Sequence, residues 1–428
     1  MHERNRRQLG RFAFVALCVL PTLTTFTWAT YRISPFRANA ERAHWENKLF
    51  QRTGLLAKVE RVEHPAGGSV LLLGVELTDP DGGDRVVGLR QIEVAATPQG
   101  DVVLLSQPQI SQGKFLRLWD ILHDRVLRGP LPETAIQMST GELTVEIGQH
   151  AQTFTHVRCT VEPHETGVRA FVDFQLAGVE MPSPVQLQIE RNRQITPPMT
   201  GWTLHTDTAI PCDLFRDYLP ALAYLGPQCS FQGTVAAAIS RGDWSAELTG
   251  RFSRIDLDRA TSAFPHKLIG SADLIVRRAF VQKGLLQEAS GQFFSSGGNV
   301  STSLLVSLAE QLQGKISTKV TQTSPQYTSY RQLAFDFELS TAGMTIVGRC
   351  GDANGGVVIS SGSDELLSVN PRQSHSLVGI VRALSPASDS LVPATEESQG
   401  LLGVLAFPRV REASSAIARP PRARVRME

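Results

Sequence analysis

Apolar and polar residues alternate along most of this chain. Residues 168–176, 185–189 and 333–339 place apolar side chains at every second position and polar ones between them. Strict alternation is typical of a β-strand with one apolar and one solvated face. Short turn sequences such as residues 79–83 and 241–243 separate the alternating runs. The pattern predicts a mostly β protein, built as a meander of antiparallel strands.

Helical spacing is confined to short inserts. Residues 38–52, 115–127 and 212–219 show it, and residues 304–312 show it more weakly. The chain is therefore expected to be of the α+β kind, with short helices between many strands.

The N-terminus carries one long uncharged run. Residues 12–31 are 20 consecutive residues without a charge, enough to cross a hydrocarbon core of about 30 Å. The excess of arginine in residues 1–11 places that segment in the cytoplasm. A transmembrane helix is thus predicted at 12–33, with the rest of the chain in the periplasm or another extracytoplasmic space. A cleaved signal peptide is the alternative, although its apolar core is usually only about 7–15 residues long.

The body and the tail differ in character. Residues 34–370 form the predicted β-rich body, whereas alternation stops after residue 371 and serine and proline increase. Residues 371–428 are expected to be a solvated, poorly ordered tail, and its terminal arginines suit either solvent or anionic lipid headgroups.

Composition narrows the function classes. The 428 residues carry 42 Lys and Arg against 41 Asp and Glu, a net charge of +1, whereas nucleic-acid binders usually have a basic face. A hydrophobic share of 42% excludes a disordered chain. No nucleic-acid partner is expected.

Motifs for catalysis, metals or cofactors do not emerge from the sequence. The ten histidines are scattered, and His-Glu-x-x-His, Cys-x-x-Cys and Gly-x-Ser-x-Gly are missing. Asp79, Asp81 and Asp84 could gather a cation, but a turn explains them better. We therefore expect no enzyme, no metal and no cofactor. Cys212 and Cys229 flank an apolar segment and either pair as a disulfide or stay buried free thiols.

Taken in order, the segments resemble the AsmA-like family of membrane-anchored envelope proteins. The opening, the later strand pair with its preceding helix, and the closing hairpin carry the resemblance, in residues 53–62, 74–80, 92–95, 213–225, 229–236, 244–257, 330–340 and 344–348. It covers roughly residues 10–370 and depends on an overall plan more than on one motif.

The resemblance implies an extended, curved antiparallel sheet that encloses an apolar groove outside the cytoplasmic (inner) membrane. Proteins of this group are associated with moving phospholipids between membranes or with envelope assembly. The candidate groove residues are Val172, Phe174, Leu176, Phe231, Val235, Leu333, Phe335 and Phe337. Each is also suited to a self-filled core without a ligand.

Three functions follow as hypotheses. The first is a membrane-anchored protein that holds or moves acyl chains of phospholipid or another lipid, contributing to envelope lipid transport or assembly. The second is a non-catalytic structural or assembly factor that binds another envelope protein through exposed β-edges. The third is an exported enzyme whose site is assembled from distant residues.

Overall fold

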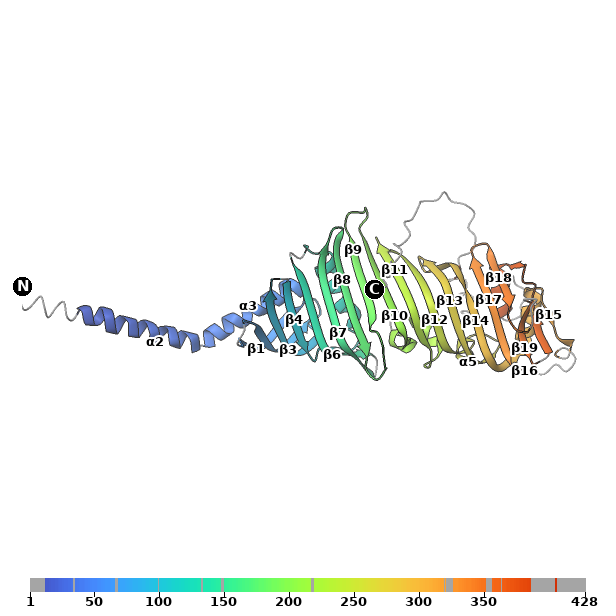
Figure 1. Ribbon diagram of the computed structural model, residues 1–428, viewed down its shortest axis with the longest axis horizontal. Coiled ribbons are helices and arrows are strands. Elements are labelled where there is room, and N and C mark those ends of the chain that lie inside the picture. The colour runs from blue at the N-terminus through green and yellow to red at the C-terminus, as the bar shows by residue number, and fades with distance from the viewer. Residues whose placement is uncertain are drawn as a thin grey trace, which may run out of the picture. The chain divides into compact units, whose positions relative to one another are not determined.

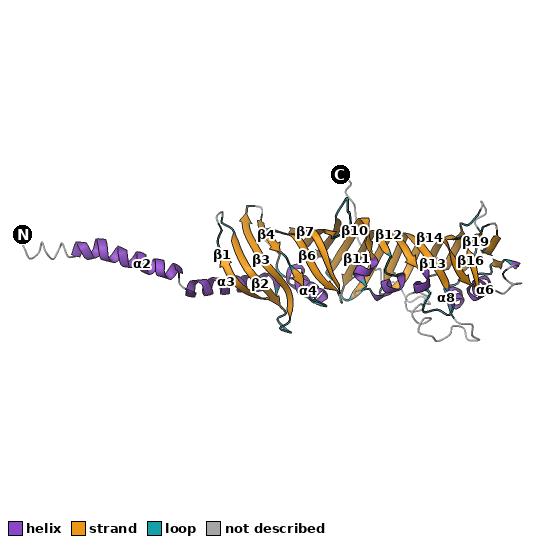
Figure 2. Cartoon of the chain, turned by 90° about the horizontal axis from the view of Figure 1, so that it is seen from below, coloured by secondary structure: helices purple, strands orange, loops and turns teal. Residues whose placement is uncertain are grey.

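Strands dominate the protein, as Figure 2 shows. The computed structural model describes residues 12–33, 35–65, 68–98, 100–131, 134–147, 150–216, 219–318, 320, 326–351, 356–362, 364–385 and 405. The chain divides into two compact units, unit 1 (residues 1–156) and unit 2 (residues 157–428). Each is described by itself below, and β7 (His150–His164) contains the boundary between them.

Unit 1 begins with helices and continues with strands. Its elements are η1 (Val15–Val19), α2 (Leu20–Ile33), α3 (Pro35–Thr53), β1 (Leu56–Glu63), β2 (Val70–Thr78), β3 (Arg85–Thr97), β4 (Gly100–Ser106), β5 (Gln109–Ile110), α4 (Phe115–Leu122), η2 (His123–Leu127) and β6 (Ala135–Ile147). Helices α3, α4 and η2 confirm the helical spacing at 38–52 and 115–127.

The described helices were compared with the length and apolarity that a membrane span needs. In the part of the chain that is described, none of the helices is both long and apolar enough to cross a bilayer. The single span at 12–33 stays a prediction, and residues 1–11 lie outside the described residues.

The sheet of unit 1 combines antiparallel and parallel pairs. β1, β2 and β3 pair in antiparallel order, and β3 then pairs with β4 and β5 in succession. β6 runs parallel to both β4 and β5. The link from β5 to β6 contains α4 and η2, and a crossover of that length allows the next strand to run parallel. The prediction of a wholly antiparallel sheet is wrong here.

Helices α3 and α4 pack on the sheet of unit 1. Trp45 on α3 and Ile121 on α4 join the same apolar cluster as the strand residues Leu72 and Val75. Those two strand residues are both buried although they are three positions apart. Gly74 between them has φ +59°, a conformation that suits glycine. Strict alternation therefore fails at this point of β2.

Unit 2 contains most of the strands. Its elements are β8 (Gly167–Leu176), β9 (Val185–Asn192), β10 (Met199–Pro211), η3 (Cys212–Phe215), η4 (Pro220–Leu225), β11 (Ser230–Ser240), β12 (Asp243–Asp256), α5 (Leu257–Ala260), β13 (Leu268–Gln282), β14 (Leu285–Ser301), α6 (Thr302–Gln311), β15 (Lys315–Ile316), β16 (Tyr327–Tyr330), β17 (Gln332–Ser340), β18 (Gly343–Gly348), β19 (Val357–Ser361), β20 (Asp364–Ser368), β21 (Ser374–His375) and α8 (Leu377–Leu384).

The predicted antiparallel meander is confirmed in unit 2. Each strand from β8 to β14 pairs with the next, and β14 pairs with β17, which pairs with β18 (Figure 1). All of these pairs are antiparallel because short turns join most of the neighbours. Long lateral rows of side chains result, since directly paired residues lie on the same face of a sheet.

The C-terminal part of unit 2 is a packed core. Leu304 and Leu305 of α6 and Leu367 of β20 belong to one buried cluster, and Ile380 of α8 packs against it. Figure 2 shows α6 and α8 side by side near β16 and β19. The expected poorly ordered tail therefore does not begin at residue 371, because β21 and α8 follow that residue. Residues 386–404 and 406–428 lie outside the described residues.

Candidate functional site

One face of the unit 2 sheet carries a continuous apolar row. The central row crosses nine strands, and its members are paired directly from strand to strand: Val172, Leu187, Leu204, Val235, Leu248, Ala279, Ala289, Leu339 and Met344. The alternation of apolar and polar residues predicted that one face of each strand is apolar. The register makes it continuous, because every strand contributes an apolar residue at the same level.

Two apolar rows flank the central row. The first consists of Ala170, Ile189, Trp202, Ala237, Ala246, Val281 and Leu286. The second is the phenylalanine row, and a row that contains three glycines separates it from the central row. The phenylalanine row consists of Ile210, Phe231, Phe252, Leu274, Phe293, Phe335 and Gly348. We call these three rows, with the glycine-containing row, the apolar face.

The glycine-containing row lets aromatic rings lie close to the sheet. Gly233, Gly250 and Gly291 occupy it, together with Phe337. A Cβ placed on Gly291 would come within 3.0 Å of Cζ of Phe337. Phe337 in turn lies 6.3 Å from Phe335, edge to face. The same Cβ would lie only 2.2 Å from the Ile275 carbonyl oxygen, so an alanine at Gly291 would clash with the backbone of β13 and also crowd a ring of the apolar face.

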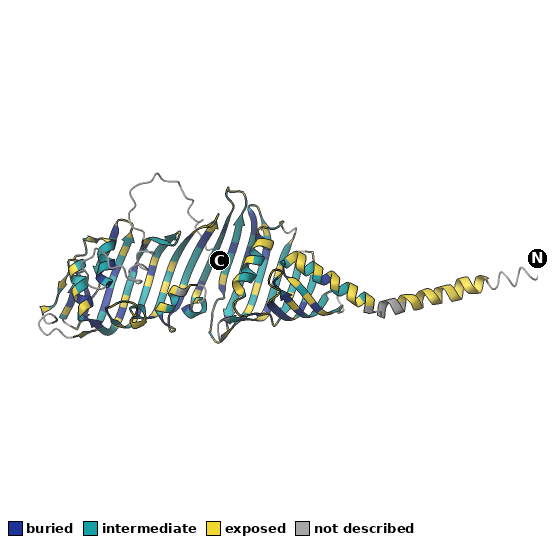
Figure 3. Cartoon of the chain, turned by 180° about the vertical axis from the view of Figure 1, so that it is seen from behind, coloured by how far each residue is buried: buried dark blue, intermediate teal, exposed yellow. Residues whose placement is uncertain are grey.

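Among the described residues, short helices pack on the apolar face at the phenylalanine row. Leu225 of η4 and Leu257 of α5 pack in the same cluster as Phe231 and Phe252, whose rings are 4.9 Å apart. The phenylalanine row is therefore largely core. In the described residues, β8, β9 and β10 pack chiefly against neighbouring strands. Most of the central row is half-buried rather than buried, and Figure 3 colours much of this sheet as intermediate.

The predicted groove residues fall into two groups. Val172, Val235 and Phe174 are half-buried, and the first two lie in the central row. Phe335 and Phe337 are also half-buried, but Phe335 stacks on Phe293 with 5.2 Å between ring centroids. The remaining candidates are buried side chains of the core, namely Leu176, Phe231 and Leu333.

Several residues of the apolar face were not singled out from the sequence. Leu204, Leu248 and Ala289 lie in its central row, and Trp202 lies beside it. Alternation marks these residues as facing one side of a strand. Their lateral alignment depends on the register of distant hairpins, which the sequence does not show.

The opposite face of the same strands is polar and charged. Arg278 pairs with Glu247 at 2.8 Å between Nε and Oε1, and Arg169 pairs with Glu190 at 3.4 Å. His205 contacts Thr234 Oγ1 through Nδ1 at 2.8 Å and Asp207 Oδ1 through Nε2 at 3.1 Å. We call this the polar face.

Cys212 and Cys229 lie at one end of the phenylalanine row. Their Sγ atoms are 3.1 Å apart, and the two residues are only 2% and 1% exposed. The Cys212 amide also donates to the Cys229 carbonyl at 2.9 Å. The hydrogen bond to Cys229, together with burial, raises the pKa of the Cys212 thiol. The thiols are in contact without a bond, so pairing as a disulfide stays a prediction.

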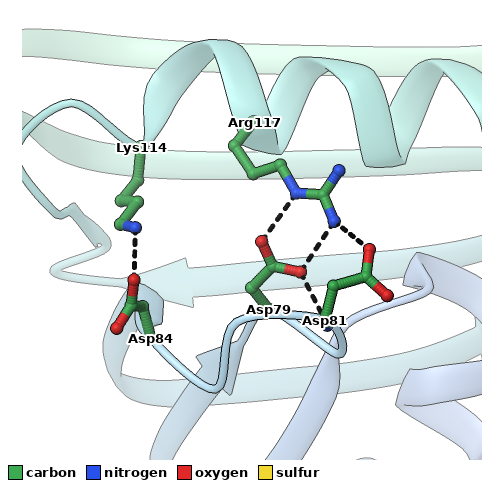
Figure 4. Close-up of polar contacts among 5 residues, drawn as sticks. All are labelled: Asp79, Asp81, Asp84, Lys114 and Arg117. Carbon is green, nitrogen blue, oxygen red and sulfur yellow. Dashed lines mark hydrogen bonds and ion pairs between the residues drawn. The ribbon is translucent and has the colours of Figure 1, made fainter.

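The three aspartates of the turn between β2 and β3 in unit 1 pair with two basic side chains (Figure 4). Arg117 of α4 makes two hydrogen bonds to Asp79, at 2.6 and 2.8 Å, and also contacts Asp81. Lys114 Nζ lies 2.6 Å from Asp84 Oδ2. The hydrogen bond from Arg117 holds the pKa of the buried Asp79 well below its ordinary value. This network fastens the start of α4 to the turn between β2 and β3.

Unit 1 also has an open polar depression of about 410 Å³. Its charged lining residues are Glu60, Glu76, Arg85 and Arg90, and no His, Ser or Cys lines it. Within the described parts of the chain, no three His, Cys, Asp or Glu side chains gather as a metal site would require.

Comparisons with family models, with curated proteins and with solved structures found no match to this chain.

Proposed function

We propose that this chain is a membrane-anchored, extracytoplasmic protein that holds or moves the acyl chains of phospholipid or another lipid. The central row of the apolar face carries the proposal, because it presents apolar side chains across nine strands and most of them are half-buried. A sheet with one apolar face needs a partner for that face. Core packing supplies the partner at the phenylalanine row, and acyl chain supplies it elsewhere.

The dimensions of the row suit acyl chains. Neighbouring strands lie about 4.8 Å apart, so eight spacings span roughly 38 Å. One leaflet of a bilayer core is about 15 Å thick, which is the length an extended lipid tail covers there. Each methylene shielded from water contributes about 0.8 kcal/mol, so six methylenes contribute about 5 kcal/mol.

The membrane placement rests on the sequence. The uncharged run at 12–31 and the arginines before it favour a single span with the body outside the cytoplasm, in the inner membrane of a cell envelope. The resemblance to the AsmA-like family supports a role in envelope lipid transport or assembly. Neither catalysis nor a cofactor is part of the proposal.

Co-purified lipid tests the proposal directly. The full chain is extracted in detergent and examined by native mass spectrometry, with lipid identified after release. We expect a bound acyl lipid that remains through purification. A chain that is folded and consistently free of lipid would count against the proposal.

The alternative is a structural or assembly factor that binds another envelope protein by strand addition. One observation favours it: Leu405 forms an isolated parallel bridge with Leu286 of β14, where β17 has already ended. That stretch of β14 therefore accepts an added extended segment. Recovery of an envelope protein crosslinked at β14, in a chain without lipid, would favour this alternative.

A further inference from the structure

The open depression of unit 1 lies on the face of its sheet that points away from the core. Val59, Val75 and Leu89 pair directly across β1, β2 and β3 and belong to the buried cluster of this unit. Successive side chains of a strand point to opposite faces, so the sequence neighbours of these three residues point outward. Those outward neighbours that carry a charge and line the depression are Glu60, Glu76 and Arg90.

The charges around the depression have both signs and are not paired with one another. Its four charged lining residues are exposed, and none of their side chains makes an ion pair or a hydrogen bond within the described residues. Elsewhere in unit 1 such charges do pair, as Arg117 does with Asp79 at 2.6 Å. Two carboxylates and two guanidinium groups are therefore available to a ligand. The volume of about 410 Å³ is in the range of small-molecule sites.

Two glycines let two of these charges lie directly on the sheet. A Cβ placed on Gly74 would come within 2.3 Å of Glu60 Cδ, and one placed on Gly88 within 1.7 Å of Arg85 Nη2. The carboxylate and the guanidinium thus occupy the space that side chains at Gly74 and Gly88 would need.

The register places these two charges at a distance that one small ligand can bridge. Gly88 pairs directly with Glu76, so Gly74, two positions before Glu76 on β2, is a diagonal neighbour of Gly88. Diagonal neighbours lie about 7–8 Å apart, too far for a direct ion pair. A ligand that contacts both carries its positive and negative groups only a few bonds apart.

We propose that this depression binds a compact zwitterion with an ammonium group at one end and a phosphate at the other. Glu60 and Glu76 accept hydrogen bonds from the ammonium group, which has three N–H donors. Arg85 and Arg90 donate to the phosphate, because the planar guanidinium matches its oxygens. Phosphoethanolamine has this chemistry, either as a free molecule or as the headgroup of a lipid. The site lies within unit 1 and does not depend on the apolar face of unit 2.

Calorimetric titration of the full chain in detergent compares phosphoethanolamine with its two halves, ethanolamine and inorganic phosphate. We expect phosphoethanolamine to bind on the order of tenfold more tightly than either half, since one molecule then makes both sets of contacts. Arg85→Gln and Glu60→Gln should each weaken its binding roughly fivefold. The control is Lys58→Gln, because Lys58 pairs with Glu76 in the sheet but does not line the depression. It should leave the affinity unchanged.

Gly88→Ala separates the position of the guanidinium from its charge. The φ of Gly88 is not positive, so alanine suits the backbone, and its methyl group would displace only the head of Arg85. This variant keeps every charge and should still lose roughly as much affinity as Arg85→Gln. Thermal unfolding of each variant shows whether it is folded.

A second titration distinguishes the two sources of the ligand. It uses short-chain phosphatidylethanolamine and phosphatidylglycerol with identical acyl chains. A preference for phosphatidylethanolamine that Glu60→Gln removes, without binding of free phosphoethanolamine, would assign the lipid headgroup as the ligand. Tight binding of free phosphoethanolamine would assign the soluble molecule.

Two results would overturn the inference. One is a wild type that binds phosphoethanolamine no more tightly than its halves and does not prefer phosphatidylethanolamine. The other is full affinity in folded Arg85→Gln and Glu60→Gln variants, which would show that these charges only solvate the outer face of the sheet. Either result would leave acyl-chain binding by the apolar face of unit 2 unaffected, so the two proposals fail separately.

Discussion

Replacing Leu204 by aspartate should abolish most acyl-lipid binding. Leu204 lies in the central row between Leu187 and Val235 and is half-buried, so roughly half of a leucine's burial energy is still available to a ligand. That half amounts to about 1 kcal/mol. A carboxylate covered by methylenes costs about 2 kcal/mol or more because it loses water without gaining a partner. The sum of about 3 kcal/mol corresponds to binding weaker by roughly a hundredfold.

The adjacent residue provides the matched control. Thr203 precedes Leu204 on β10, pairs with Gln188 and Ala236, and belongs to the polar face. Thr203→Asp introduces the same charge one position away and should change affinity less than threefold. Both variants are titrated with a fluorescent acyl lipid, and their thermal unfolding is compared with that of wild type.

Equal losses in the two variants would refute the argument from the two faces. Full binding by a folded Leu204→Asp variant would refute the assignment of the central row. Leu204→Ser is the fallback if the aspartate variant does not fold, and it should weaken binding by about fivefold, the loss of contact alone.

Three other perturbations test the structure around this face and in unit 1. In an oxidising compartment, Cys212→Ser should lower the free energy of unfolding by about 3 kcal/mol, because a disulfide to Cys229 would close a loop between residues 17 positions apart. Urea unfolding that is the same with and without reductant would exclude that disulfide. Burial lowers the pKa of His375, so the unfolded chain binds the proton more readily than the folded chain does. The free energy of unfolding, measured in urea, should therefore fall as the pH drops below about 6.5. His375→Gln should flatten that part of the pH dependence. Because Arg117 lowers the pKa of Asp79, their contact stabilises the fold above about pH 4, and this stabilisation is lost as the pH falls through the native pKa of Asp79. Arg117→Gln should speed amide hydrogen exchange in α4 at pH 7. Unchanged exchange would contradict the role of Arg117 in holding α4 to the turn.

The faces of individual strands could be predicted from local alternation. Residues 168–176 and 333–339 place their apolar side chains on one side of the sheet, as the pattern indicates. Which of those side chains stay accessible could not be predicted. Phe231 is buried because η4 and α5 pack against its cluster, and alternation carries no information about what covers a face.

The alignment of residues across neighbouring strands could not be predicted from the sequence for a different reason. The register of β10 on β11 shifts between Thr206 and Ile210, and that of β12 on β13 shifts twice. These shifts change which residues meet by two positions between β10 and β11 and by one position at each shift between β12 and β13, so local alternation alone does not give the lateral rows. The parallel strand β6 was missed because the helical insert before it was recognised without its consequence for strand direction.

Helix α8 had a local signal that the composition of the tail obscured. Leu377, Val381 and Leu384 have helical spacing, and Ser376 caps the helix by accepting from the Gly379 amide at 3.0 Å. The serine and proline residues that follow led to the expectation of a tail from residue 371. The apolar spacing of 377–384 was the better guide.

Photo-crosslinking at two neighbouring positions tests the central claim most directly. A benzophenone amino acid replaces Leu204 on the apolar face or Thr203 on the polar face of the full chain, and adducts are identified by mass after irradiation in membranes. We predict a lipid adduct from position 204 and none from position 203. Lipid adducts at both positions alike, or only protein adducts at position 204, would contradict a face that holds acyl chains.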